Sequence, residues 1–293
     1  MAGKSGFLER NLKYIFPLPA VIFIFLLMIF PIAYLLFMSF TNGNVTSETP
    51  GRFVGFQNYA GVLGYPRFQM AFFRTFVFTF GAVITQTILG TIIALILHRK
   101  FKGKNVLKMI MLLPLVVAPV VTGIAFQLLF DPASGFLNFV LSSLGLPQSG
   151  WVTDARTVIP SLILVDTWQW TPLISLIVLA GLSGLPPEPF ESAKVDGANS
   201  AQTFFRVTLP MITPTIITAV ALRSVAALRT YDIIAVMTKG GPDFASETIN
   251  TLAFQFSFVS RYHGQSSAML VIFFSIILFC GIGITRLRKK FEV

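Results

Sequence analysis

One apolar run of the sequence holds residues that could bind a polyhydroxylated ligand. Within residues 158–185, Asp166, Trp168, Gln169 and Trp170 interrupt a stretch of aliphatic side chains. Sites for sugars need aromatic faces to pack against C–H surfaces, and polar groups to bond the hydroxyls. Tryptophan is also enriched at membrane–water interfaces. The pattern therefore leaves two interpretations open, a ligand pocket and an interfacial anchor.

A second apolar run, residues 207–237, carries three charged residues, Arg223, Arg229 and Asp232. Charges are costly at membrane depth, so they should face a cavity or pair with one another. Arg229 and Asp232 are three positions apart and could neutralise each other on one helix. Arg223 has no partner within its own run. It could serve an anionic substrate or a structural contact.

Residues for catalysis are not brought together anywhere in the pattern. Gly3-Lys4-Ser5 is a fragment of a phosphate loop without its upstream glycine or a preceding strand. His98 and His263 fall near opposite faces of the predicted membrane domain and cannot share a metal. No paired carboxylates, and no nucleophile with a nearby base, can be placed together. We therefore expect no enzyme, no metal site and no cofactor in this chain.

The elements that must position these residues are membrane helices. The chain is 54% hydrophobic and 12% charged, whereas soluble domains carry about 25% charged residues. Six runs are each long enough to cross a bilayer core of ~30 Å. They cover residues 15–40, 75–97, 109–130, 158–185, 207–237 and 264–285. The sequence predicts an all-α membrane protein of six transmembrane helices, forming one permease domain over residues 1–293.

The basic residues predict how the helices are oriented. Of the 22 Lys and Arg residues, fourteen fall on the side of the two termini and six on the other side. The richer side should be cytoplasmic, which places both termini and the connection 186–206 in the cytoplasm. The basic residues lie at the ends of apolar runs and not in one patch, so we expect membrane lipid as a partner and no nucleic acid. The connection 238–263 faces outward.

The cytoplasmic connection has clear helix start and stop signals. Proline at 187 is followed by Glu191, whose carboxylate favours the positive end of a helix. Gly197 is the expected left-handed stop, and Asn199 with Gln202 is the pattern of a helix N-cap. These signals predict a short helix, a sharp corner and a return helix. A solvated interfacial turn and a surface that docks a partner are both compatible with that geometry.

The same stretch resembles the signature loop of permease subunits in binding-protein-dependent ABC importers. That signature reads Glu-Ala-Ala, three residues, Gly, nine residues, Ile, one residue and Leu-Pro. The matching residues here are Glu191, Ser192, Ala193, Gly197, Val207, Leu209 and Pro210. The resemblance implies the type I importer permease fold, with a coupling helix that docks on a separate ATPase dimer holding ATP and Mg. It also implies a second homologous permease subunit, forming a heterodimer, and an extracellular or periplasmic binding protein.

Other segments are similar to carbohydrate-type permeases of maltose-like, glycerol-phosphate and polyol systems, in their six-span form. They are FVGFQNYAGVL (residues 53–63), DTWQWTPLISLIVLAGLSGLP (166–186) and TKGGPDFASETINTLAF (238–254). This similarity implies import of a sugar, oligosaccharide or polyol, with Gly240, Gly241 and Pro242 at the binding-protein contact. It also implies a bacterial or archaeal cytoplasmic (inner) membrane. A permease for glycerol phosphate or an amino acid remains an alternative, as does an ion-coupled secondary transporter, although no internal repeat supports the latter.

Overall fold

The structure is a computed structural model that describes residues 12–14, 16–43 and 51–291. All regular elements among these residues are helices, apart from one isolated bridge between Thr41 and Phe53. The expected all-α class is confirmed. The helices pack into two compact units, Met1–Gly64 with Ala253–Ile272 and Tyr65–Leu252 with Phe273–Val293.

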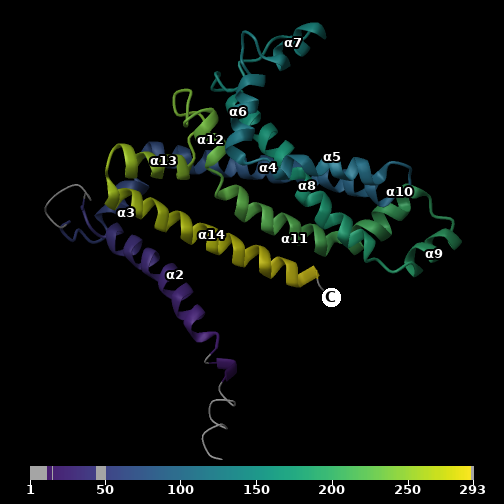
Figure 1. Cartoon of the computed structure of the whole chain (residues 1–293), viewed down its shortest axis with the longest axis horizontal. Coiled ribbons are helices and arrows are strands. Elements are labelled where there is room, and N and C mark those ends of the chain that lie inside the picture. The colour runs from purple at the N-terminus through teal and green to yellow at the C-terminus, as the bar shows by residue number, and fades with distance from the viewer. Residues whose placement is uncertain (1–11, 15, 44–50, 292–293) are drawn as a thin grey trace, which may run out of the picture. The chain divides into compact units, whose positions relative to one another are not determined.

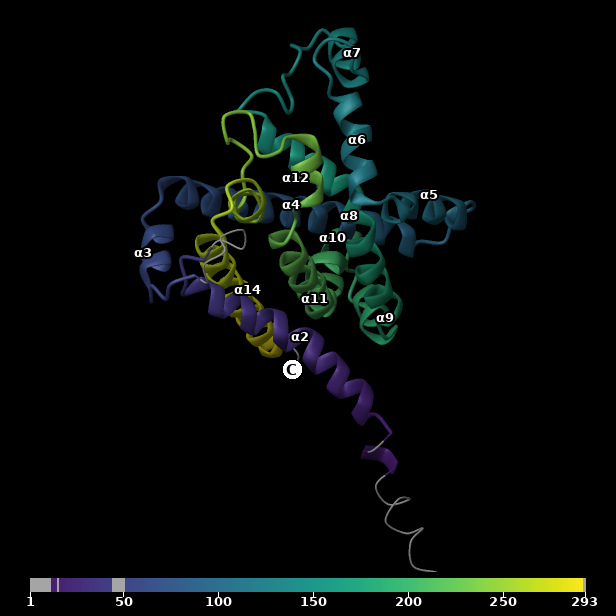
Figure 2. The same ribbon diagram turned by 60° about the vertical axis from the view of Figure 1, so that its left-hand side comes forward.

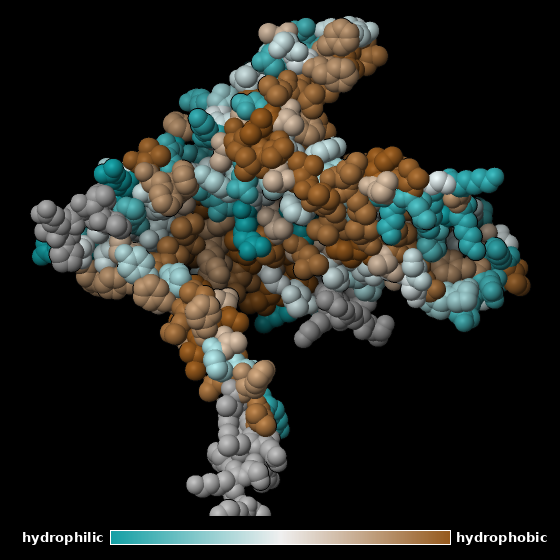
Figure 3. Space-filling view, in the orientation of Figure 1, coloured by the Kyte–Doolittle hydropathy of each residue, from teal (hydrophilic) through white to brown (hydrophobic). Residues whose placement is uncertain are grey.

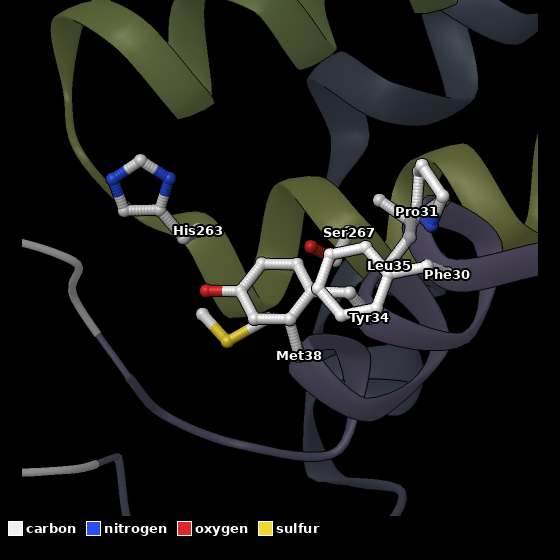
Figure 4. A pocket seen from close by; sticks show the side chains of 7 residues that line it. All are labelled: Phe30, Pro31, Tyr34, Leu35, Met38, His263 and Ser267. Carbon is white, nitrogen blue, oxygen red and sulfur yellow. The ribbon is translucent and has the colours of Figure 1, made fainter. Parts of the chain in front are cut away.

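The first unit contains helix α2 (Leu18–Ser39), helix α3 (Gln57–Leu63) and the first turns of helix α14 (His263–Phe291). Asn58 fastens α3 to the end of α2, because its side-chain amide donates to the carbonyls of Ser39 and Thr41 at 2.8 Å each. A small pocket of about 250 Å³ lies between α2 and α14 (Figure 4). The residues that line it are Phe30, Pro31, Tyr34, Leu35, Met38, His263 and Ser267.

Three long helices form the core of the second unit, α4 (Pro66–His98), α8 (Val158–Ser183) and α11 (Leu209–Leu228). Figures 1 and 2 show them running alongside one another. Glycine permits a close approach of α4 to α8. A Cβ atom built at Gly90 of α4 would lie 2.9 Å from the Cγ2 of Ile174 and 3.1 Å from the backbone nitrogen of Ser175, both on α8. The two helices therefore pack backbone against side chain at this level.

The expected third span is broken. Helices α5 (Lys104–Val116) and α6 (Pro119–Leu129) meet at a bend of 99°. Val117 and Ala118 between them have extended backbone, and the residue before a proline is biased toward that conformation. The structure thus has five helices that are long and apolar enough to cross a membrane, or six if the bent pair counts as one span. Helix α7 (Phe136–Ser143) follows α6.

Other boundaries also differ from those expected. Helix α4 begins at Pro66, which at the first helical position has the required φ and no N–H to lose. The fifth span ends at Leu228, and a separate helix α12 (Asp232–Met237) follows it. Helix α13 (Ile249–Phe254) and the π-helix η2 (Gln255–Val259) then lead to α14. At the opposite end of the second unit lie α9 (Glu188–Val195), α10 (Ser200–Thr203) and the π-helix η1 (Phe204–Thr208).

The surface of the second unit is divided by polarity. Apolar side chains cover the region of α4 and α8, whereas polar side chains gather around α9, α10 and the start of α5 (Figure 3). This division agrees with helices that cross an apolar layer and with connections that leave it.

Candidate functional site

Helix α9 and the turn after it form a sharp corner, as the sequence predicts. Glu188 and Glu191 lie in the first turn of α9, and Gly197 has a φ of 73°. The N–H of Ala198 donates to the carbonyl of Ala193 at 2.9 Å, and this is the 6→1 bond of a Schellman motif. The predicted left-handed helix stop at Gly197 is therefore confirmed.

A capping box starts the return helix. The N–H of Gln202 donates to Oδ1 of Asn199 at 2.9 Å, and the N–H of Asn199 donates to Oε1 of Gln202 at 2.8 Å. Both bonds satisfy N–H groups that an uncapped helix leaves open, and the predicted N-cap is confirmed. The chain passes from α10 through η1 into α11, whose first two residues are Leu209 and Pro210.

The residues of the signature differ in exposure. Ala193 is 8% exposed and is the buried residue of α9, whereas Glu191 and Ser192 are exposed. Val195, one turn after Glu191, is 88% exposed.

A cleft of about 810 Å³ separates α9 from the ends of α4 and α8. Glu191 and Lys194 of α9 line one wall, and His98 and Arg99 line the opposite wall. The carboxylate of the signature thus stands over a cleft with basic side chains on its other side, and α9 projects from the end of the helical core.

A buried polar cluster joins the three core helices at mid-length. Gln86 of α4 donates from Nε2 to Oδ2 of Asp166 on α8 at 2.7 Å, and Arg223 of α11 donates from Nε to Oε1 of Gln86 at 2.8 Å. Arg223 and Asp166 also form an ion pair. Asp166 and Gln86 are 0% exposed and Arg223 is 2% exposed. The cluster is a three-way joint among α4, α8 and α11.

The sequence left open whether Arg223 serves an anionic substrate or a structural contact. Arg223 has its partners on two other helices, so the structure gives it a structural contact. Trp170, four residues after Asp166, lies on the same face of α8, with the guanidinium carbon of Arg223 5.2 Å from its ring centre.

Trp168 and Gln169 point elsewhere, because consecutive residues of a helix turn by about 100°. Trp168 is 44% exposed and packs edge-on against Phe126 of α6 at 5.3 Å between ring centres. Gln169 donates from Nε2 to the carbonyl of Val117 at 2.9 Å, at the bend between α5 and α6. The structure therefore brings Asp166 and Trp170 together with Arg223, and it turns Trp168 and Gln169 toward α6 and the α5–α6 bend.

The predicted pairing of Arg229 with Asp232 is wrong. Arg229 is the C-cap of α11, and Asp232 is the first residue of α12. The turn between them removes the helical spacing on which the pairing depended. Both side chains are exposed, and no ion pair joins them in the part of the chain that the structure describes. Burial, and next the charge of Asp232, raises the pKa of Tyr231 in this turn.

The Gly240-Gly241-Pro242 segment forms a tight turn, in which the N–H of Gly241 donates to the carbonyl of Thr238 at 2.8 Å. We call residues 238–247 the glycine turn. Ser246 binds across it, since its Oγ donates to the carbonyl of Gly241 at 2.5 Å and its N–H donates to the carbonyl of Gly240 at 3.2 Å. Gly241 and Pro242 line a depression of about 380 Å³ together with Asp131. Hydrogen bonds from Ser134 hold the pKa of Asp131 below its ordinary value.

Sequence reasoning missed one pair at this turn. Arg67, in the first turn of α4, donates from Nε and Nη2 to the two carboxylate oxygens of Glu247, each at 2.6 Å. The residues are separated by 180 positions. No local signal in the sequence indicates that Arg67 and Glu247 are partners.

Comparison with known proteins defines the class. Residues 86–291 match the profile of the "Binding-protein-dependent transport system inner membrane component" family. That match spans the second part of α4, all of α8 and α11, the corner and the glycine turn. The chain belongs to this family of membrane permeases, and it is a multi-pass membrane protein.

Individual relatives carry more specific names. The chain is 34% identical over 278 residues to the trehalose/maltose transport system permease protein MalF of Thermococcus litoralis, covering 95% of this chain and 94% of the relative. It is 30% identical over 270 residues to the trehalose transport system permease protein SugA of Mycobacterium tuberculosis, covering 92% and 86%.

Among solved structures, a chain of a bacterial alginate ABC transporter, crystallised with an alginate pentasaccharide-bound periplasmic protein, superposes with a TM-score of 0.85. The match covers 98% of this chain and 97% of that one at 20% identity. It shows the importer permease fold. The expected fold class and family are confirmed.

Proposed function

We propose that the chain is the membrane subunit of an ATP-driven importer for a carbohydrate, whether sugar, oligosaccharide or polyol. The observation that carries this proposal is the corner of residues 188–208, where the permease signature coincides with a projecting helix. Glu191 lies on its exposed first turn, Ala193 fixes it to the core, and Gly197 turns the chain. In this role α9 docks on a separate ATPase, which binds ATP and Mg, and this chain itself carries no cofactor.

The carbohydrate assignment is supported by the named relatives, which transport trehalose or maltose, and by the alginate system that shares the fold. The buried charges are compatible with an uncharged substrate. Arg223 is engaged by Asp166 and Gln86, so an anionic substrate such as glycerol phosphate would have to break an existing ion pair to use it.

Three partners complete the proposed importer. A second, homologous permease subunit would form a heterodimer with this chain, and the apolar window of the N-terminal span, 0% buried in the isolated chain, offers it surface. An ATPase dimer would receive α9 from one side. A substrate-binding protein would contact Gly240, Gly241 and Pro242 from the other, in a bacterial or archaeal cytoplasmic membrane.

Purification of the tagged chain from native membranes tests this assignment. A second six-span permease and an ATPase should copurify at fixed stoichiometry, and ATP hydrolysis by the complex should rise when its sugar-loaded binding protein is added. Isolation of the chain alone, with ion-gradient-driven uptake in vesicles lacking ATP, would overturn the proposal. Measuring which sugars bind the copurified system's binding protein would then identify the substrate.

A further inference from the structure

The glycine turn has an unusual backbone. Four of its residues have φ in the left-handed region, and three of them are not glycine. They are Lys239 at 52°, Gly240 at 90°, Asp243 at 45° and Phe244 at 59°. Side chains with a Cβ atom disfavour this region, so such a conformation persists only where surrounding contacts impose it. Residues with such strained backbone conformations cluster at binding sites and active sites.

The Arg67–Glu247 pair ties this turn to helix α4, in addition to the bonds that Ser246 makes across it. The guanidinium and the carboxylate meet as two parallel hydrogen bonds of 2.6 Å, the geometry of a fork-to-fork pair. Glu247 is 2% exposed, so its charge is desolvated and depends on Arg67. The same guanidinium lies 3.7 Å from the ring centre of Phe244, a left-handed residue of the turn.

Arg67 is itself held rigidly. It follows Pro66, the first residue of α4, so its backbone belongs to the longest helix of the core. A second bond fixes the start of α13, just after the turn, to the same helix, because the N–H of Ile249 donates to Oγ1 of the buried Thr75 at 3.1 Å. The turn and the residues that follow it are thus attached to α4 at two points, two helical turns apart.

The tip of the turn is left free to meet a partner. Phe244 is 45% exposed although its ring contacts Arg67, and Gly241 and Pro242 open onto the depression near Asp131. A rigid base under an exposed aromatic and a glycine turn is the arrangement of a preorganised protein-binding loop, in which the ordering cost is met before binding.

We propose that Arg67 and Glu247 are positioning residues for the substrate-binding protein. They hold the glycine turn, and with it Phe244, in the shape that this protein recognises. The inference rests on the proposed importer function and adds the residues that set the strength of docking. When the pair is broken, the turn relaxes toward ordinary backbone conformations. The binding-competent shape becomes a minor population, and the apparent affinity falls by that fraction.

The test uses the complex copurified with this chain, reconstituted in lipid. The rate of ATP hydrolysis is measured as the concentration of the binding protein is raised. R67M, E247Q and the double variant R67M/E247Q should each raise the half-stimulating concentration about tenfold, as expected if one turn in ten remains competent. The maximal rate should return at saturating binding protein. The double variant should resemble the single ones, because both residues act through one contact.

Two further variants make the result specific. R156M removes another exposed outward arginine and should leave the titration unchanged. R67K retains the charge without the fork and should give an intermediate shift, which covers the case in which R67M fails to assemble. Amide hydrogen exchange at residues 240–247 should speed up in the R67M complex before any binding protein is added.

An unchanged half-stimulating concentration in R67K and E247Q, or a reduced maximal rate without a shift in that concentration, would overturn the positioning role. A wild-type complex that no binding protein stimulates would instead refute the importer function on which the inference rests. The two failures are therefore distinguishable.

Discussion

Replacing Arg223 by methionine should strongly destabilise the helical core, because the substitution leaves the carboxylate of Asp166 buried without its ion-pair partner. Asp166 is 0% exposed and accepts from both Gln86 and Arg223. Removing one partner of a buried pair costs about 3–5 kcal/mol. D166L should cost a similar amount, since it leaves the guanidinium of Arg223 uncompensated between α4, α8 and α11.

Removing both charges should cost less than the two single changes added together. In R223M/D166L neither buried charge remains, and the residual cost comes from Gln86, which loses two of its three bonds and keeps the one to the Asp166 backbone carbonyl at 3.1 Å. An unsatisfied buried amide costs about 1–3 kcal/mol. The double-mutant cycle should therefore give a coupling energy of several kcal/mol between positions 166 and 223.

The assay is the fraction of dispersed, detergent-soluble chain that survives a temperature series, with equal membrane insertion as a prior check. R229M is the matched control, because Arg229 caps the same helix but is exposed, and its melting curve should match the wild type. Additive losses in the double variant, or a single variant as stable as R229M, would refute the three-helix joint.

Three further changes probe the corner and the core. G197V should lower transport while the chain still inserts, because a β-branched residue at φ 73° costs about 1–2 kcal/mol. Gly103 has a φ of 85° and equally open surroundings, so G103V is the matched control. Equal transport by the two variants would contradict a special role for the corner. N199A should remove the capping box at about 1 kcal/mol and reduce ATPase coupling measured as transport per ATP, with unchanged coupling as the contrary result. G90V should lower the stability of the chain by about 1–3 kcal/mol in the same melting assay, because the added side chain overlaps α8. G281V, in open surroundings, should leave the melting curve unchanged. Similar melting curves for the two variants would show that small shifts of α4 and α8 accommodate the added side chain.

The corner could be predicted in detail because its signals act over a few residues. The left-handed stop at Gly197 and the reciprocal bonds of Asn199 and Gln202 depend on local backbone alone. A helix stop and a capping box are short-range structures, so their residue types and spacing are sufficient evidence for them.

The joints between helices could not be predicted in the same way. Arg223 was recognised as costly at membrane depth, but its pairing with Asp166 depends on how α8 and α11 pack, which hydropathy does not encode. The pairing of Arg67 with Glu247 could not be predicted for the same reason. The error at Arg229 and Asp232 came from assuming a continuous helix through a turn that an apolar run conceals.

The bend between α5 and α6 has a similar explanation. A window of hydropathy sums side-chain polarity and is blind to direction, so residues 109–130 were indistinguishable from a straight span. Pro119 was the available signal. Proline inside apolar helices is often tolerated with a modest kink, and only the extended backbone at Val117 and Ala118 turns that kink into a right angle.

The π-helix η1 adds one residue to the helical path between α10 and α11. Its wider turn, Phe204–Thr208, contains about one residue more than an α-helical turn, which rotates everything before it by roughly 100° relative to α11. The spacing between Gly197 and Leu209 is therefore an angular setting as well as a distance. A single deletion within residues 204–208 would allow a regular α-helix, but it would rotate α9 about the axis of α11 and point it in a different direction. A designed chimera that joins a foreign corner to this span must keep the extra residue of η1 to preserve the direction in which α9 points.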